Sequence, residues 1–383
     1  MTAALPFTRE DYGGRMEAFR TGLRARGLET AIVTAASNIC YLTGYGHKGA
    51  GLRALVVTPG RDPALVVSDI EVGNAEAILG KSPVSSYKTY LSYGVGSPAR
   101  TVADVLGAKT GKGLEIGIEP QSWPAGDLDA LRAALPDTKF ASIAGMINRQ
   151  RLVKTPIELD YLRRAAAVAD HASTATVAAM RPGVSEGHLA AIAMTTMIEH
   201  GGEYQAGWPN VKSGPTSGIV HTGWTDRMIE QGDHIYVELA GVFNYYHAPI
   251  WRTAFVGKPD DERRRCADAI GRASDAGLAA VRPGTTCGEI HRIQKAILDE
   301  AGFGEHMLKL SGYSVGLALP PSWMEGTTVG PGSDLALEPR MVFHLGAYVL
   351  IPGRWAIAAS QTVGVTANGH ENLTKTEKGP LFL

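Results

Sequence analysis

The spacing of apolar residues changes repeatedly along the first part of the chain. Stretches with apolar residues three and four positions apart, as on one face of a helix, alternate with short apolar runs typical of buried strands. This alternation predicts an α/β domain that ends near residue 148. The expected helices are 9–27 and 128–135, and the expected strands are 31–34, 53–58, 63–68 and 117–119.

A strong helix start marks the beginning of a second domain. A short basic stretch leads to Thr155, Pro156 and Glu158, which fit an N-cap, a first helical position and a capping box. An alanine-rich helix is expected to follow from about 157 to 180. The chain has 383 residues, which is long enough for two domains. The expected domains are 1–150 and 151–383.

The second domain contains an internal repeat. Residues 180–202 and 281–303 share an Arg-Pro-Gly turn, a helix capped by Ser or Thr and a closing glycine, and each copy follows a long helix. Two copies are too few for a solenoid. They predict an α+β domain with pseudo-twofold symmetry and an active site where the halves meet. Chance similarity of two capped helices is the alternative.

A β-hairpin is predicted between the two helical repeats. Two apolar, aromatic-rich runs within residues 235–257 flank a turn that contains glycine. The first run carries Glu238, and the second carries His247 and Pro249. Because side chains alternate along a strand, His247 and Pro249 are expected on the same face.

Further polar and aromatic residues are expected near this hairpin. His221 lies in a loop that precedes it, together with Trp224. A later strand places His344 and Gly346 on one face. The segment between these elements contributes Tyr313, Trp323 and Glu325.

The composition is that of a globular protein, with 44% hydrophobic and 20% charged residues and a formal net charge of −1. Such a balance gives no electrostatic attraction for nucleic acid or an anionic membrane, so neither is an expected partner. No apolar run reaches the roughly 18–20 residues that span a bilayer, and the first residues lack the features of a signal peptide. Cys40, Cys266 and Cys287 are widely spaced and odd in number, as expected for reduced thiols in a cytoplasmic protein.

The hairpin resembles the core hairpin of the creatinase/aminopeptidase family, which includes methionine aminopeptidase, prolidase and creatinase. The resemblance implies a creatinase-like α/β domain followed by a pita-bread domain around a curved antiparallel sheet. It also implies five positions that hold aspartate, glutamate or histidine as metal ligands in the metallopeptidases. In this chain those positions hold Glu238, Pro249, Tyr313, Gly346 and Ser360.

These substitutions remove most of the implied metal ligands. Divalent cations prefer charged oxygens or imidazole nitrogens, and of the five residues only Glu238 offers a good donor. No metal or other cofactor is therefore expected. The remaining possibility is an ion relocated to Glu238, His247 and His344.

Several segments resemble the ectoine hydrolases, a metal-free branch of the same family. One departure is the segment 358–361, where this chain has Ala-Ala-Ser-Gln and ectoine hydrolases keep a Glu-Ile-Thr-Glu-like sequence. Trp251 and Tyr348 also differ in bulk from that branch. The matching motifs are His-x-x-Trp-x-Asp at 221–226, Glu-x-Ala-Gly-Val at 238–242, Tyr-His-Ala-Pro at 246–249, Gly-Tyr-x-x-Gly-Leu at 312–317, Pro-Pro-x-Trp at 320–323 and Phe-His at 343–344.

The resemblance implies a metal-independent hydrolase that cleaves a C–N bond of a small cyclic amidine or guanidino compound. The expected partner is thus a small zwitterionic or cationic substrate. A carboxylate can hold an amidinium group by paired hydrogen bonds and either attack its carbon or direct water onto it, while a histidine protonates the leaving amine. The expected catalytic residues are Glu238, His221, His247 and His344, and the expected substrate-binding residues are Trp224, Tyr313, Trp323, Glu325 and Tyr45.

The resemblance also implies a homodimer in which the N-terminal domain of one subunit closes the pocket of the other. The apolar, aromatic segment 38–53 fits such a contact. Three other functions stay open: a lyase on a zwitterionic osmolyte, an inactive binding protein and a metal-dependent Xaa-Pro peptidase. The structural alternative for Glu238 is a buried ion pair with Arg252.

Overall fold

A computed structural model describes residues 5–46, 49, 51–107 and 114–383. The chain divides into two compact units, 1–151 and 152–383. Residues 47, 48 and 50, in the segment 38–53 that was expected at a subunit contact, lie outside the described residues. Within the described ranges, no helix is both long and apolar enough to cross a membrane. Cys40, Cys266 and Cys287 are buried and form no disulfide.

The described residues of the first unit form six strands and six α-helices, the last of which ends one residue into the second unit. Its strands are β1 (Thr30–Val33), β2 (Ala54–Val57), β3 (Ala64–Ser68), β4 (Ser86–Tyr90), β5 (Glu115–Ile118) and β6 (Lys139–Ser142). Its helices are α1 (Arg9–Arg24), α2 (Ala36–Thr43), α3 (Val72–Ile78), α4 (Pro98–Leu106), α5 (Ala125–Ala134) and α6 (Met146–Leu152).

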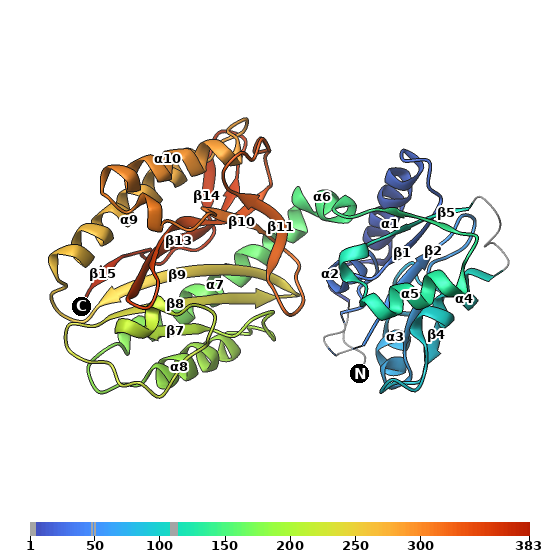
Figure 1. Ribbon diagram of the computed structural model, residues 1–383, viewed down its shortest axis with the longest axis horizontal. Helices are drawn as coiled ribbons and strands as arrows, with labels where there is room; N and C mark the ends of the chain where they lie inside the picture. The colour runs from blue at the N-terminus through green and yellow to red at the C-terminus, as the bar shows by residue number, and fades with distance from the viewer. Residues whose placement is uncertain (1–4, 47–48, 50, 108–113) are drawn as a thin grey trace. The chain divides into compact units, whose positions relative to one another are not determined.

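The strands of the first unit form one mixed sheet in the order β4-β3-β2-β1-β5-β6 (Figure 1). Helices α4 and α5 pack on it through a core that includes Ile32, Val66, Val102 and Leu131. The predicted helices correspond to α1 and α5, and the predicted strands to β1, β2, β3 and β5. β4 was not predicted because it is an edge strand of largely exposed polar residues and carries little apolar pattern.

The second unit contains four long helices and nine strands. The helices are α7 (Pro156–Ala178), α8 (Glu186–Glu199), α9 (Asp261–Ala279) and α10 (Cys287–Glu300). The strands are β7 (Asn210–Ser213), β8 (His234–Phe243), β9 (Tyr246–Phe255), β10 (Gly312–Val315), β11 (Met324–Val329), β12 (Val342–Ile351), β13 (Trp355–Val365), β14 (His370–Asn372) and β15 (Leu381–Phe382).

Two sheets form the centre of the second unit, in the orders β15-β9-β8-β7 and β11-β10-β12-β13-β14. α7 and α8 cover the first sheet, and α9 and α10 cover the second, as Figure 1 shows. α7 lies so close to β8 that a Cβ atom on Gly241 would stand 2.0 Å from the carbonyl oxygen of Ala165. The two sheets meet along β9 and β13, where the Trp251 amide donates to Ser360 Oγ at 2.7 Å.

The predicted start of α7 is present. The Glu158 amide donates to Thr155 Oγ1 at 3.3 Å, and the Thr155 amide donates to Glu158 Oε2 at 2.8 Å. These two bonds complete the capping box that the sequence indicated.

The predicted duplication is visible in equivalent backbone hydrogen bonds. In each half, the Arg-Pro-Gly turn and the first residues of the following helix pair with a segment that precedes a central strand. The matching N–H to O=C bonds are Gly183–Ile229 (2.9 Å) and Gly284–Leu337 (2.9 Å), Glu186–Arg227 (3.0 Å) and Cys287–Leu335 (2.9 Å), and Gly187–Thr225 (3.0 Å) and Gly288–Ser333 (2.8 Å).

Candidate active site

The second unit contains a cavity of about 560 Å³. Strands of both sheets line it, together with the loops that contain residues 207–208, 220–223 and 321–323. Among the described residues that line it, Glu238 is the sole carboxylate and His221 the sole histidine, and none is lysine or arginine. The cavity therefore suits a cation better than an anion.

Glu238 lies on β8 between two cross-strand neighbours, Asn210 on β7 and Trp251 on β9. Its Oε1 accepts a hydrogen bond from Trp251 Nε1 at 2.8 Å, and its Oε2 accepts one from the Tyr236 hydroxyl at 3.2 Å. Burial raises the pKa of Glu238, while these hydrogen bonds and the nearby His221 act in the opposite direction. Only neutral donors hold the carboxylate in place.

Aromatic rings form much of the wall around Glu238. The Tyr348 ring meets Tyr236 edge-on at 5.5 Å and Trp251 edge-on at 5.4 Å between centroids. Trp323 Nε1 donates to the Tyr313 hydroxyl at 2.9 Å, which joins two further lining residues. Aromatic faces attract cations, so this wall and the carboxylate favour the same kind of ligand.

His221 lines the cavity from an exposed loop and has a left-handed backbone, with φ 56°. Trp224, expected to bind substrate, does not belong to the cavity lining. Its ring meets that of Trp208, which does line the cavity, at 6.0 Å between centroids. The loop thus brings His221, but not Trp224, to the cavity.

His247 is buried outside the cavity lining, contrary to the expectation of a direct catalytic role. Its Nε2 accepts a hydrogen bond from the Ala206 amide at 3.0 Å, and its Nδ1 lies 2.8 Å from the Tyr245 carbonyl oxygen. Both ring nitrogens are therefore used by the backbone. Strand alternation gave the correct face of β9, but the loop around Ala206 covers the ring.

His344 is also buried outside the cavity lining. Its Nε2 lies 2.6 Å from Ser360 Oγ, and its ring contacts Trp251 at 4.4 Å and Tyr313 at 5.0 Å between centroids. Burial lowers the pKa of His344 to about 3, so the ring is neutral near pH 7. His344 supports the aromatic wall from behind.

Glu325 is a further expected substrate contact that the structure places elsewhere, whereas the expected contact of Tyr45 stays a prediction. Glu325 is buried in an ion pair with Lys154, with 2.5 Å between Oε2 and Nζ, and does not line the cavity. Tyr45 belongs to the first unit, where its side chain is 2% exposed. The ion pair accounts for the burial of Glu325, because Lys154 compensates its charge.

The alternative role for Glu238, an ion pair with Arg252, is wrong. Arg252 Nη1 donates to the Ser360 carbonyl oxygen at 2.7 Å, and Nη2 donates to Gln361 Oε1 at 3.0 Å and Thr376 Oγ1 at 2.8 Å. The guanidinium group therefore binds the C-terminal half of the unit.

The residues at the five family metal positions do not fit a catalytic divalent ion. Glu238 alone keeps a carboxylate, and Pro249 and Gly346 have no side-chain donor atom. The Tyr313 hydroxyl already accepts a hydrogen bond, and Ser360 Oγ is bonded to a histidine and a backbone amide. The described residues contain no group of three or more His, Cys, Asp or Glu that could hold a metal, and this also removes the relocated ion.

Some lining residues were not predicted. Asn210 and Tyr236 contact Glu238 but have no distinctive motif, although Tyr236 follows from strand alternation because it lies two positions before Glu238. The sequence distinguishes Trp251 and Tyr348 only by their bulk, which does not indicate that they line the cavity. Asn210 Oδ1 is buried without a hydrogen-bond partner among the described residues, and so could accept one from a ligand.

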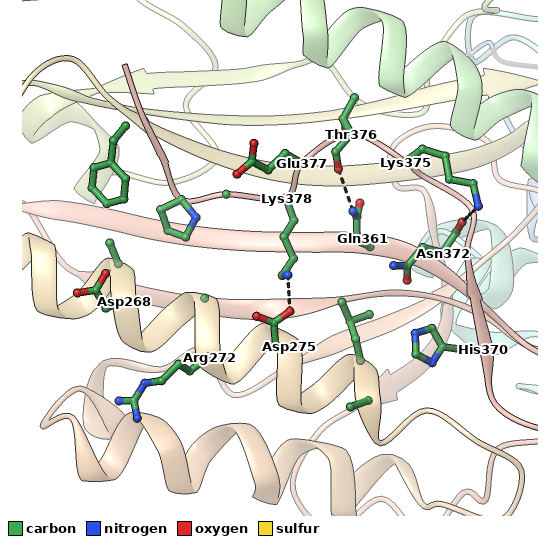
Figure 2. Close-up of a pocket in the computed structure, with 17 residues that line it drawn as sticks. Asp268, Arg272, Asp275, Gln361, His370, Asn372, Lys375, Thr376, Glu377 and Lys378 are labelled. Atoms are coloured by element: carbon green, nitrogen blue, oxygen red, sulfur yellow. Dashed lines mark hydrogen bonds and ion pairs between the residues drawn. The ribbon is translucent and has the colours of Figure 1, made fainter.

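A second, larger groove of about 790 Å³ lies between α9 and the C-terminal segment, and it shares no lining residue with the cavity of Glu238. Figure 2 shows Lys378 paired with Asp275 across this groove, at 2.5 Å, and Gln361 bonded to Thr376. The first contact holds the C-terminal segment on α9, and the second holds it on β13. The groove lining carries charges of both signs, including Asp268, Arg272 and Glu377, whereas the first cavity surrounds a single carboxylate with aromatic side chains. The first cavity is therefore the candidate active site.

Comparison with known proteins identifies matches over both units. Residues 160–367 match metallopeptidase family M24, and residues 15–153 match the creatinase/prolidase N-terminal domain. The chain is 27% identical to ectoine hydrolase from Halomonas elongata, over 97% of this chain and 96% of that protein. It is 28% identical to the probable dipeptidase PepE of Mycobacterium tuberculosis, over 95% of this chain and 94% of that protein.

Solved structures show the same arrangement. The crystal structure of dipeptidase PepE from Mycobacterium ulcerans matches with a TM-score of 0.84 and 26% identity, covering 98% of this chain and 99% of that one. A prolidase from Pyrococcus horikoshii matches in fold, with a TM-score of 0.81 at 24% identity, covering 95% of this chain and 99% of that one.

Proposed function

Because the chain belongs to metallopeptidase family M24, we propose that it is a hydrolase of this family that works without a metal. Its substrate is a small cyclic amidine or guanidino compound, in which it cleaves a C–N bond. The observation that carries this proposal is the environment of Glu238. One carboxylate held by neutral donors lies in an aromatic cavity where the family's ligand positions offer no further acidic residue or histidine.

The cavity supports binding of a delocalised cation. An amidinium group is planar and presents N–H donors that a carboxylate can accept in pairs. Glu238 supplies that carboxylate, and the rings of Trp251 and Tyr348 supply faces for cation–π contact. A bound cation also offsets the desolvation of Glu238, which has no cationic partner of its own among the described lining residues.

The same residues support hydrolysis. The amidinium carbon is electrophilic because its positive charge is shared with its nitrogens. Glu238 either directs a water molecule onto this carbon or attacks it directly, in which case water later hydrolyses the bond between Glu238 and the carbon. In both routes the tetrahedral adduct expels one nitrogen as an amine. His221, the described histidine of the cavity lining, protonates that amine. The balance is addition of one water molecule, which converts the amidine to an amide and a free amine.

The second candidate is a metal-dependent Xaa-Pro peptidase. It is supported by the likeness to the protein named PepE and to structures titled prolidase. The replaced ligand positions weigh against it, because Pro249 and Gly346 cannot coordinate an ion. If none of the tested compounds is hydrolysed, the result would favour a lyase or an inactive binding protein.

The test is an incubation of the purified protein with ectoine, hydroxyectoine, creatine and simple amidines, followed by mass spectrometry. Without added metal, we expect a cyclic compound to give one product heavier by one water molecule, or creatine to give two smaller products whose masses sum to that of creatine plus water. A parallel incubation uses an Xaa-Pro dipeptide with added Mn²⁺ or Co²⁺. Dipeptide cleavage that needs the metal, with no turnover of the amidines, would replace the proposal with the peptidase.

A further inference from the structure

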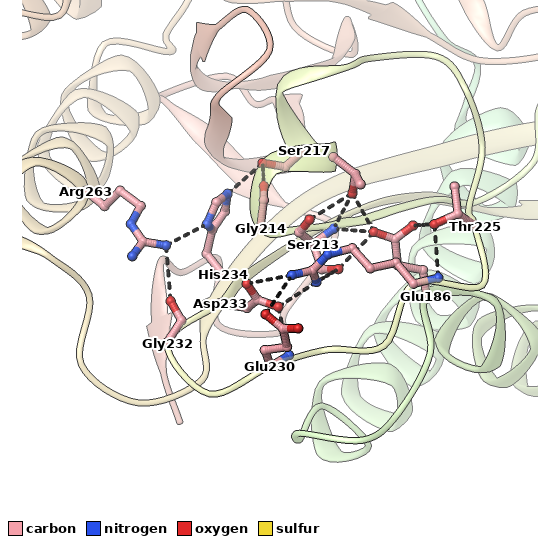
Figure 3. A network of polar contacts seen from close by, with 12 residues as sticks. Glu186, Ser213, Gly214, Ser217, Thr225, Glu230, Gly232, Asp233, His234 and Arg263 are labelled. Atoms are coloured by element: carbon pink, nitrogen blue, oxygen red, sulfur yellow. Dashed lines mark hydrogen bonds and ion pairs between the residues drawn. The ribbon is translucent and has the colours of Figure 1, made fainter.

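A buried carboxylate outside the cavity, Glu186, lies at the first helical position of α8 and is 0% exposed. Its Oε1 accepts hydrogen bonds from the Ser213 amide at 2.7 Å and the Ser213 hydroxyl at 2.9 Å, and the Thr216 hydroxyl lies 2.5 Å away. Its Oε2 accepts from the Thr225 amide at 3.0 Å and the Thr225 hydroxyl at 2.7 Å. Figure 3 shows these bonds meeting at Glu186.

The bonds join the two ends of one segment. Ser213 and Thr216 come before residues 217–224, and Thr225 comes directly after them. The enclosed segment carries His221, which lines the cavity. Glu186 thus fastens both stems of the loop that presents the cavity's histidine.

The network also reaches the strand that carries Glu238. Arg227 Nη1 donates to Ser213 Oγ at 2.7 Å and to Asp233 Oδ2 at 2.6 Å. Asp233 immediately precedes β8. A continuous set of contacts therefore runs from Glu186 through Ser213 and Arg227 to the beginning of β8.

The other half of the unit shows that the fold does not require this carboxylate. Cys287 occupies the position equivalent to Glu186, and its amide makes the equivalent backbone bond. The second half thus keeps the turn, the helix start and the backbone pairing with a thiol in place of the carboxylate. Glu186 is found in the half whose loop carries His221.

Glu186 is charged at neutral pH. Burial alone would raise its pKa, but the hydrogen bonds from Thr216, Thr225 and Ser213 hold the pKa below its usual value. Hydrogen bonds to a charged acceptor are stronger than those between neutral groups, so the loop stems are held more firmly than ordinary turns.

We propose that Glu186 is a positioning residue that holds the His221 segment over the cavity through Ser213, Thr216 and Thr225. This inference rests on the proposed function for the role of His221, but the anchoring itself does not depend on any substrate. A histidine displaced by about 1 Å can lose on the order of a hundredfold in rate, so firm anchoring has a clear use.

The test uses the full-length variants Glu186→Gln, Thr225→Val and Thr225→Ser. Hydrogen–deuterium exchange of residues 217–224 reports the anchoring directly, without a substrate. Glu186→Gln replaces one of the two acceptor oxygens with an amide donor, and Thr225→Val removes a hydroxyl donor. We expect both to speed exchange of this segment about tenfold or more while exchange of β8 and β9 stays unchanged. Thr225→Ser keeps the hydroxyl and should restore slow exchange.

The control is Glu158→Gln, which alters another buried carboxylate near a helix start, where it accepts from Tyr246 at 2.7 Å. It should leave exchange of 217–224 as in the unaltered protein. With an active substrate, Glu186→Gln and Thr225→Val should lower kcat about 10- to 100-fold and change KM little, and Thr225→Ser should recover most of kcat.

Unchanged exchange of 217–224 in both Glu186→Gln and Thr225→Val would overturn the inference, as would an equal rise over the whole unit. If Glu186→Gln does not fold, Thr225→Val and Thr225→Ser decide the question. An unaltered protein that turns over none of the compounds contradicts the proposed function alone, because the exchange data still show whether Glu186 anchors the segment.

Discussion

Trp251 lies directly opposite Glu238 across the β8–β9 hairpin, and its indole Nε1 donates a 2.8 Å hydrogen bond to the Glu238 carboxylate. The Glu238 carboxylate is therefore bound by a neutral indole N–H and not by the guanidinium group of the neighbouring Arg252. Among the described lining residues no lysine or arginine pairs with this carboxylate. Burial raises its pKa, and the hydrogen bonds from Trp251 and Tyr236 act against that rise. This makes Glu238 available to a cationic ligand.

Trp251→Phe should therefore reduce the activity that depends on Glu238 while keeping an aromatic ring in the cavity wall. The substitution keeps an aromatic ring but removes the indole donor, which raises the pKa of Glu238 further. We expect the acidic limb of the kcat/KM profile to move to higher pH and kcat to fall about tenfold. Trp355→Phe, at a buried tryptophan outside the cavity, is the matched control. An unchanged profile in Trp251→Phe would show that the indole bond does not tune the carboxylate.

Metal removal should have no effect on turnover. Of the residues at the five family ligand positions, only Glu238 carries a carboxylate, and one such ligand cannot hold a catalytic ion. We expect elemental analysis to find far less than one transition metal per chain, and chelators to leave the rate unchanged. About one equivalent of metal together with loss of activity to a chelator would contradict this.

Mild acid should destabilise the protein through His234. Its Nε2 lies 2.6 Å from Ser217 Oγ, and Arg263 Nη1 donates to its Nδ1 at 3.3 Å, so the folded state holds a neutral ring. Burial, and then the charge of Arg263, lower the pKa of His234 from 6.5 to about 3. Between these values the unfolded chain binds one more proton here than the folded chain. The free energy of unfolding therefore falls as pH drops below 6.5, by up to about 1.4 kcal/mol per pH unit.

Urea unfolding between about pH 5 and pH 7 measures this contribution. His234→Gln should remove the part of the slope that His234 contributes, because glutamine does not titrate, while the buried His344 keeps its own contribution. His188→Gln, at an exposed histidine on α8, is the control and should keep the slope of the unaltered protein. If the free energy of unfolding changes with pH equally in the unaltered protein and in His234→Gln, then His234 has the same pKa in the folded and the unfolded state.

The assembly expected from the family resemblance stays a prediction. We expect a homodimer in which the first unit of one subunit closes the cavity of the other. Light scattering at micromolar concentration should then give twice the mass of the chain, and dilution to monomer should reduce activity. A monomer with full activity would rule the arrangement out.

Local sequence signals predicted most of the fold. The Thr155–Glu158 capping box and the repeated Arg-Pro-Gly turns are short-range patterns whose geometry depends on neighbouring residues, and both are present. β4 could not be predicted because it is an edge strand of mostly exposed polar residues and carries no such pattern. Elements with strong local chemistry were thus predictable, and an edge strand was not.

The candidate site was predictable only in part. Strand alternation places His247 and His344 on the same strand faces as the lining residues Trp251 and Tyr348. It does not indicate whether other side chains or loops cover them. The loop at Ala206 covers His247, and the bulky Trp251 separates His344 from the cavity. Glu325 binds Lys154, a partner far away in sequence that no spacing rule indicates. Such outcomes depend on long-range packing.

The most direct measurement is turnover per folded molecule of Glu238→Gln, taken with the thermal midpoint on the same preparation. Glutamine keeps the shape and removes a half-buried carboxylate that has no lysine or arginine partner among the described lining residues, so the midpoint should stay the same or rise. The chemical step should slow about 10²- to 10⁴-fold. A Glu238→Gln protein with a lowered midpoint and nearly normal turnover per folded molecule would contradict the catalytic role of Glu238.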